Sequence, residues 1–163
     1  MNVVLGNEGI KQLQGYFREK QRNLYAIVDK IEREIAEIGA SVMRSKAPTS
    51  DIDGNLPGRV IVEPRPDGWA VSYLGRDVGY IEFGTGYEGQ NSPYPDYEVL
   101  GTVGWTYDVN NHGERGWFYR SKRDGTIRYS RGMRPEKPVF DTFVEMRRQV
   151  RPIVERVLHE ELG

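Results

Sequence analysis

Residues 7–46, NEGIKQLQGYFREKQRNLYAIVDKIEREIAEIGASVMRSK, decide the fold because their apolar side chains recur with the period of an α-helix. Five of these side chains are spaced by seven positions: Ile10, Phe17, Leu24, Ile31 and Ile38. Charged residues occupy the other faces. The pattern predicts one helix of roughly 35 residues, about 50 Å long at about 1.5 Å per residue, and part of it is expected to project beyond a small sheet. The apolar stripe either lies on the protein's own sheet or continues across a subunit contact.

Strands are predicted directly after this helix. Residues 47–58 are rich in Pro, Gly, Asp and Asn, so they predict a surface loop that ends the helix. Residues 59–63 and 69–74 are rich in β-formers and are joined through a turn at 64–68. Residues 78–83 predict a short strand or a helical turn.

The region 84–131 is rich in Gly, Asn, Pro and aromatic residues and has no sustained period. We expect it to be mostly loop. Such long connections are usually either functional or disordered. Within it, residues 116–119 and 126–129 predict a hairpin through 122–125, where Asp-Gly is a turn signal.

A second helix is predicted at residues 138–162, with Pro138 in its first turn and a kink or restart at Pro152. A chain of 163 residues is the size of one domain. We therefore expect an α+β fold in which an antiparallel sheet packs against both long helices. The single domain 1–163 would contain a helix at 7–46, a sheet core at 59–83, an extended loop and hairpin region at 84–131, and a helix at 138–162.

Composition excludes several classes of protein. The chain has 23 Lys and Arg, 24 Asp and Glu, and a net charge of -1, which argues against wholesale nucleic-acid binding. With no Cys and two His, disulfide frameworks, thiol catalysis and Cys/His zinc clusters are not expected. No apolar run is long enough for a membrane span, and residues 1–7 lack the features of a signal peptide. We expect a soluble protein that is not exported.

Motifs for catalysis are also missing from the sequence. Residues 84–89 match a three-glycine dinucleotide pattern, but Pro93 and Pro95 prevent the helix that must follow it. His112 fits a solvated turn, and His159 fits the C-terminal end of a helix. There is no EF-hand, His-Glu-x-x-His or Gly-x-Ser-x-Gly. We therefore expect no enzyme activity, no catalytic or metal-binding residue and no cofactor.

Charge is segregated along the chain in a way that the net value conceals. Residues 77–111 contain no Lys or Arg and six acidic residues: Asp77, Glu82, Glu88, Asp96, Glu98 and Asp108. Residues 112–138 contain three acidic residues and eight basic ones: Arg115, Arg120, Lys122, Arg123, Arg128, Arg131, Arg134 and Lys137. We call the first set the acidic block and the second set the basic block. All of their listed residues except Glu82 and Lys137 form our candidate subunit interface.

Three interpretations of the two blocks stay open. The acidic block of one subunit would face the basic block of the next in a head-to-tail contact that closes into a ring. Alternatively, the basic and aromatic residues of 112–138 form a nucleic-acid-binding module that contacts phosphates and stacks bases. In the third, both blocks are solvated or paired within one chain. A small hydrolase is a more remote possibility, because the sequence supplies no recognisable constellation.

The order of these elements resembles the phage tail-component family of tailed double-stranded DNA phages, often labelled head-to-tail joining, neck or tail-completion proteins. The first part of the resemblance is a long helix ending in Lys46-Ala47-Pro48, followed by Gly54 and Leu56 before a strand. The second is carried by Tyr80, Glu82, Phe83, Gly84, Thr85 and Gly86, and then by the stretch 116–119. The third is carried by Gly132, Met133, Pro135, Pro138 and Phe140 before the final helix. Val139 departs from the family pattern, in which Phe commonly follows the Pro directly.

The resemblance implies an α+β fold and a non-enzymatic virion protein of the neck or tail, assembled in the host cytoplasm. Such a protein would form a homo-oligomeric ring, of six or twelve copies, that joins or completes the tail at the head-to-tail interface. Its partners would be copies of itself, neighbouring neck or connector proteins, and tail tube or terminator proteins. Genomic DNA passing through the ring would be contacted at most non-specifically, and no membrane would be bound.

Overall fold

The computed structural model describes residues 7–47, 59–75, 77–96, 98, 101, 103–108, 111 and 115–162. The loop expected at 47–58 lies outside this range except for Ala47, as do Gly54, Leu56 and His112. In chain order the elements are α1 (Asn7–Lys46), β1 (Arg59–Arg65), β2 (Gly68–Leu74), α2 (Val78–Phe83), α3 (Gly86–Gln90), β3 (Trp117–Arg120), β4 (Ile127–Ser130), β5 (Gly132–Met133) and α5 (Pro138–Leu162). The expected α+β class and both long helices are confirmed.

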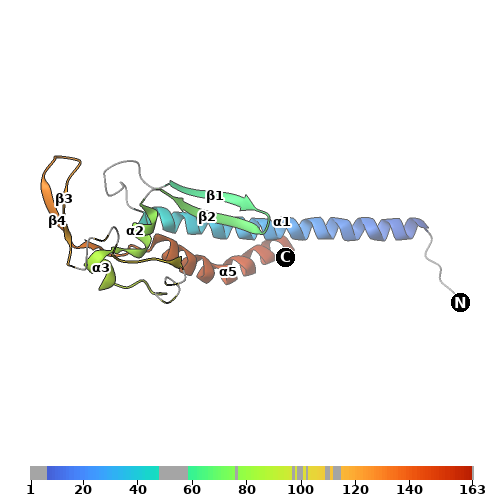
Figure 1. Ribbon diagram of the computed structural model, residues 1–163. Helices are drawn as coiled ribbons and strands as arrows, with labels where there is room; N and C mark the ends of the chain where they lie inside the picture. The colour runs from blue at the N-terminus through green and yellow to red at the C-terminus, as the bar shows by residue number, and fades with distance from the viewer. Residues whose placement is uncertain are drawn as a thin grey trace.

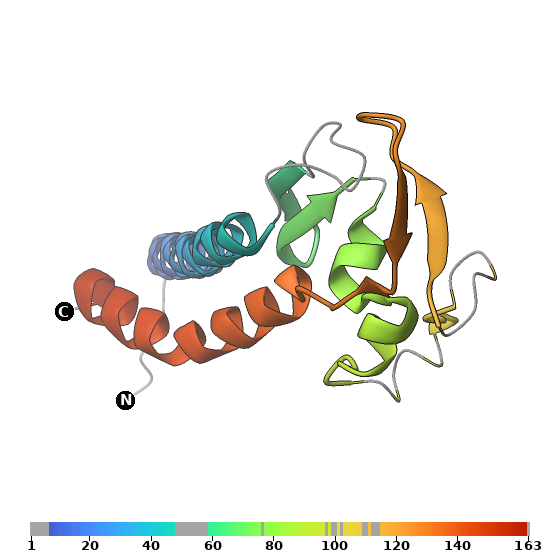
Figure 2. The same ribbon diagram turned by 90° about the vertical axis from the view of Figure 1, so that its left-hand side faces the viewer.

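Helix α1 is the central element of the body of the molecule. The β1–β2 hairpin lies along one side of its C-terminal half, and α5 lies along the other (Figures 1 and 2). The two strands are antiparallel, with Val62 opposite Val71. Helices α2 and α3 and the β3–β4 hairpin gather at the end of the body where α1 ends (Figure 1).

Two apolar clusters hold this body together. In the first, Ile27 of α1 packs with Ile153 and Val157 of α5, and partly buried residues surround them: Ile31, Ile35, Ile38 and Leu158. The second joins the C-terminal part of α1 to the hairpin and α2 through Met43, Tyr73 and Ile81. Gly39 lets α1 and α5 approach closely, because an added Cβ there would lie 2.5 Å from Met146 Sδ.

The N-terminal half of α1 extends past the end of α5, so the expected projection is confirmed (Figure 1). The contact with α5 ends near Ile27, which packs on Ile153 and Val157, and Lys30 pairs there with Glu161 of α5 at 2.6 Å. We call residues 8–26 the overhang. Every residue from Ile10 to Ala26 is exposed, whereas Ile27 is buried.

The strands form two separate two-stranded sheets, β1–β2 and β3–β4. The hairpin predicted through 122–125 is confirmed, with Phe118 opposite Tyr129. Residues 78–83 form a helix, and the region expected to be mostly loop contains α3. Pro152 lies inside a continuous α5, which is bowed (Figure 2) rather than restarted. Among the described residues, no helix is long and apolar enough to cross a membrane.

Candidate assembly interface

The residues that carry the family resemblance meet in one place. Residues 80–86, from α2 to the start of α3, lie against residues 132–140, from β5 to the first turn of α5. We call these two segments the junction. All eleven predicted motif residues lie in it, so their shared role in this structure is to join α2 and α3 to the start of α5.

Glu82 is the centre of the junction. Its side chain is only 3% exposed, yet its carboxylate has three donors. The backbone N–H of Val139 donates to Oε2 at 2.7 Å, and that of Phe140 donates to Oε1 at 2.9 Å. Because the first N–H groups of a helix lack partners within the helix and carry a partial positive charge, a carboxylate from another segment stabilises the start of α5.

Aromatic rings enclose this carboxylate. The Tyr94 hydroxyl supplies the third hydrogen bond to Glu82 Oε1, at 2.7 Å. Burial, together with that hydrogen bond, raises the pKa of Tyr94 far above its ordinary value, so the hydroxyl stays protonated as a donor. The Tyr94 ring packs edge-on against Phe83 at 5.1 Å and against Phe140 at 5.5 Å, measured between ring centroids. The rings keep water from competing for the carboxylate.

The glycines of the junction allow two backbones to touch. Thr85 pairs with Met133 and Gly86 with Gly132 in an antiparallel bridge. Gly132 has a φ of 92°, and a Cβ there would overlap the carbonyl oxygen of Thr85. Gly86 has a φ of 59°, and a Cβ there would lie 2.8 Å from the carbonyl oxygen of Arg131. Both positions therefore require glycine.

Part of the predicted subunit interface is engaged within the chain. Glu88 pairs with Arg134 at 3.2 Å and lies 3.9 Å from Arg131. The Arg131 guanidinium also lies 4.0 Å from the centroid of the Tyr87 ring. Asp77 is buried at 8% exposure. These four charged residues hold α3 and β5 together or lie inside the fold, and the remaining candidates are on the surface.

The β3–β4 hairpin, residues 117–130, stands out from the body, and we call it the arm (Figure 2). Residues opposite each other in an antiparallel pair point to the same face. Phe118 and Tyr129 therefore share one face with the pair Arg120 and Ile127. Phe118 is 74% exposed and Ile127 is 68% exposed, although the Phe118 and Tyr129 rings contact each other at 5.0 Å. The arm thus presents a largely uncovered apolar face.

Half of the eight cations of the basic block are on the arm and its turn. Arg128 pairs with Asp124 at 2.6 Å, and Arg120 donates to the carbonyl oxygen of Gly125 at 3.0 Å. Hydrogen bonds from Thr126 hold the pKa of Asp124 well below its ordinary value, so it stays charged and the turn stays ordered. The remaining surface candidates are exposed: Asp96, Glu98, Asp108, Arg115, Lys122 and Arg123.

Sequence reasoning missed three aromatic residues that complete the junction. Tyr94 binds Glu82, Trp105 packs on Phe83 at 5.0 Å, and the carbonyl of Tyr107 accepts a hydrogen bond from Gly86 N–H at 2.6 Å. The one available signal was the density of aromatic residues in 84–131, which is higher than a solvated loop needs.

Comparisons of the chain with protein-family models, with curated proteins and with solved structures found no match. Within the described residues, no group of three or more His, Asp or Glu side chains is placed to hold a metal ion.

Replacing Glu82 by Gln should lower the free energy of unfolding by about 1–3 kcal/mol, because an amide keeps one acceptor and turns an NH₂ group toward a backbone donor. Urea unfolding measures the change. Glu155→Gln is the matched control, since Glu155 is exposed and pairs only across one helical turn with Arg151 at 2.7 Å. We expect it to cost less than about 0.5 kcal/mol. Equal costs for the two variants would contradict the role of Glu82.

Replacing Gly132 by Ala should destabilise the chain far more than replacing Gly125 by Ala. Gly125 has a φ of 71° but no atom within 4 Å of an added Cβ, so only the backbone strain of about 1–2 kcal/mol applies there. At Gly132 the same strain is added to a clash with the Thr85 carbonyl, which must break the bridge. Thermal unfolding followed by circular dichroism compares the two variants, and similar melting temperatures would refute the proposed contact.

Proposed function

We propose that this chain is a structural, non-enzymatic protein of a bacteriophage virion. It forms a homo-oligomeric ring of six or twelve copies in the neck, where it joins or completes the tail at the head-to-tail interface. Its partners are copies of itself, the neighbouring neck or connector proteins, and tail tube or terminator proteins. The resemblance of residues 80–86 and 132–140 to neck proteins supports the virion setting, and the exposed arm supports assembly.

The arm is the observation that carries the proposal. A single two-stranded hairpin is at best marginally stable in water, and it usually needs a further strand or a packing surface. Here its Phe118 and Ile127 side chains are mostly exposed. Tyrosine, phenylalanine and arginine are enriched in protein interfaces, and this hairpin contains all three. The arm is therefore suited to being covered by a neighbouring subunit or by the next ring.

The junction supports the same function by fixing the base of the arm. Strand β4 ends at Ser130, and the Gly86–Gly132 bridge follows two residues later. The Trp117 ring at the start of β3 lies 3.0 Å from where a Cβ on Gly86 would be. The base is thus held to α3 while the tip remains exposed, as a subunit needs when it must present the same surface in every copy.

Charge on the surface is compatible with a head-to-tail contact. Asp96, Glu98 and Asp108 are exposed on the acidic block, and Lys122 and Arg123 are exposed at the tip of the arm. Opposite charges on two separate surfaces favour a heterologous contact, which closes into a ring when the rotation between neighbours permits.

A second candidate function rests on the same arm. Its cations lie beside exposed aromatic rings, which is how single-stranded nucleic acid is bound without sequence specificity. Arg128 is neutralised by Asp124 within the arm, which weakens this alternative relative to assembly.

Replacing Phe118 by Ala should prevent ring formation while leaving the urea midpoint of the subunit unchanged, because the ring is mostly exposed in the single chain. Native mass spectrometry and negative-stain microscopy of the purified protein measure assembly. Phe143→Ala is the matched control, since Phe143 is 59% exposed but lies on α5 and not on the arm. A wild-type chain that forms no ring, or equal loss of assembly in both variants, would contradict the proposal.

A titration with single- and double-stranded DNA at two salt concentrations tests the second candidate. Phosphate contacts make binding weaken steeply as salt rises. We expect at most weak binding that disappears at the higher salt and does not depend on sequence. Tight binding that Arg120→Glu with Lys122→Glu abolishes would favour the nucleic-acid module instead.

A further inference from the structure

The apolar stripe of α1 continues onto the overhang, where nothing in the described chain covers it. Ile10, Leu13, Phe17 and Leu24 follow the helical spacing of Ile27, Ile31, Ile35 and Ile38, which pack against α5. These four residues are 43–64% exposed. Because residues at this spacing share one helix face, the uncovered stripe is the direct extension of the α1–α5 contact.

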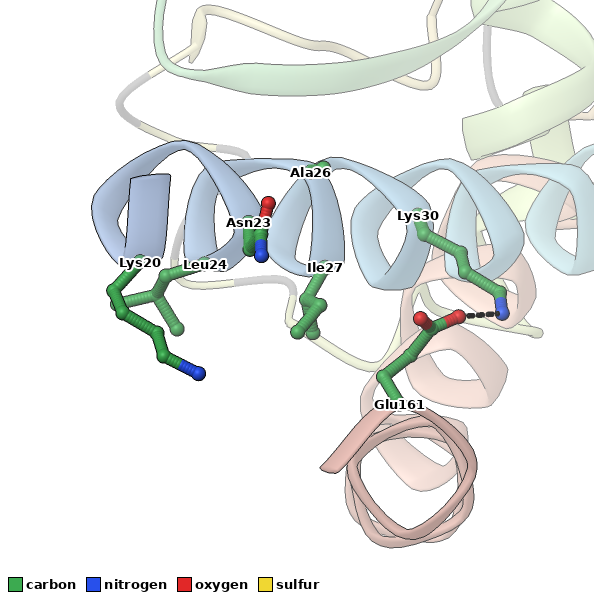
Figure 3. Close-up of a pocket in the computed structure, with 7 residues that line it drawn as sticks. All are labelled: Lys20, Asn23, Leu24, Ala26, Ile27, Lys30 and Glu161. Carbon is green, nitrogen blue, oxygen red and sulfur yellow. Dashed lines mark hydrogen bonds and ion pairs between the residues drawn. The ribbon is translucent and has the colours of Figure 1, made fainter. Parts of the chain in front are cut away.

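A hollow lies at the step where α5 ends. It has a volume of about 540 Å³ and is lined by Lys20, Asn23, Leu24, Ala26, Ile27, Lys30 and Glu161. Figure 3 shows Leu24 and Ile27 pointing into the space beside the last turn of α5, while Lys30 and Glu161 close its other side. A helix that prolonged the line of α5 along α1 would fill this hollow with its first apolar side chain.

We propose that this missing helix is the overhang of a second copy of the chain, packed antiparallel to the first. Phe17 lies midway between Ile10 and Leu24, seven residues from each. A twofold axis at Phe17 therefore places Ile10 of each copy on Leu24 of the other, beside the hollow. In this register residue 7 of the second copy lies opposite Ile27, which is where the exposed part of α1 begins.

The register explains three features together. The second helix begins beside the last turn of α5, which covers Ile27 but leaves Leu24 exposed. It runs in the same direction as α5, since α5 is antiparallel to α1 (Figure 1). Its N-terminal end faces the C-terminal end of α5, so the partial charges of the two helix ends are opposite. The uncovered stripe of one copy therefore has the length and direction that the other requires.

Lys20 selects the antiparallel arrangement over the parallel one. It lies in the stripe between Phe17 and Leu24. In a parallel pair in register, the two Lys20 ammonium groups would face each other across an apolar contact, which is unfavourable. In the antiparallel pair Lys20 lies opposite Gln14. The cation of the stripe then meets a neutral polar side chain.

This pairing uses the end of the molecule opposite the arm and does not depend on the proposed ring (Figure 1). A chain that lost the ring contact would still pair through the overhang. A chain that lost the overhang contact would still carry an intact arm. The two proposals therefore fail separately.

Cysteine cross-linking tests the arrangement, because the natural chain contains no Cys and a single substitution gives one thiol per copy. With a short bismaleimide, Phe17→Cys should link to itself. Ile10→Cys and Leu24→Cys should not self-link, since each is about 21 Å along the helices from its own copy at 1.5 Å per residue. A mixture of the Ile10→Cys and Leu24→Cys chains should link to each other. Self-linking of Ile10→Cys with the efficiency of Phe17→Cys would overturn the antiparallel pairing.

A charge placed in the stripe tests the contact itself. Phe17→Glu should raise the dissociation constant of the pair by at least about tenfold in sedimentation equilibrium, because two carboxylates would be brought together at the axis. Tyr25→Glu is the control, since Tyr25 is exposed on α1 but off the stripe. Circular dichroism verifies that both variants keep their helices. A Phe118→Ala chain that does not self-associate, or a Phe17→Glu chain that pairs as well as the Tyr25→Glu chain, would overturn the proposal.

Discussion

One buried carboxylate determines how the two halves of the chain meet. Glu82 accepts hydrogen bonds from Val139 N–H, Phe140 N–H and the Tyr94 hydroxyl, so it fixes the start of α5 against α2. A buried charge is tolerated only when its hydrogen-bonding capacity is met, and the partial positive charge of a helix N-terminus meets it here. Helix α5 starts at this point and runs along α1, where the two helices form an apolar cluster.

The sequence predicts the parts of this structure that depend on local patterns. Helices α1 and α5 are long enough for their 3.6-residue period to be read, and Asp124-Gly125 marks the β3–β4 turn. Helices α2 and α3, with six and five residues, are too short to display a period. The role of Glu82 was not predictable, because its partners Val139 and Phe140 are 57 and 58 residues away and donate through backbone groups.

The two uncovered apolar surfaces lie at opposite ends of an elongated molecule (Figure 1). The arm is fixed to the junction, and the overhang is a direct extension of α1, so α1 runs between the regions that the two proposals assign to contacts (Figure 1). Only 37% of the residues are hydrophobic, yet many large apolar side chains are exposed. The two uncovered surfaces contain several of these exposed side chains. The apolar side chains that the chain does have are divided between its own core and surfaces suited to other chains.

The junction also joins the two ends of the chain segment, between Ile81 and Glu136, that contains the arm. Glu136 N–H donates to the carbonyl of Ile81 at 2.9 Å, so the chain leaves and returns to the helical body at one point. The entropy of closing a loop changes only slowly with its length. Insertions or deletions at the exposed turn of the arm therefore leave the helices in place, and the reach of the arm is free to vary while the body that carries it stays constant.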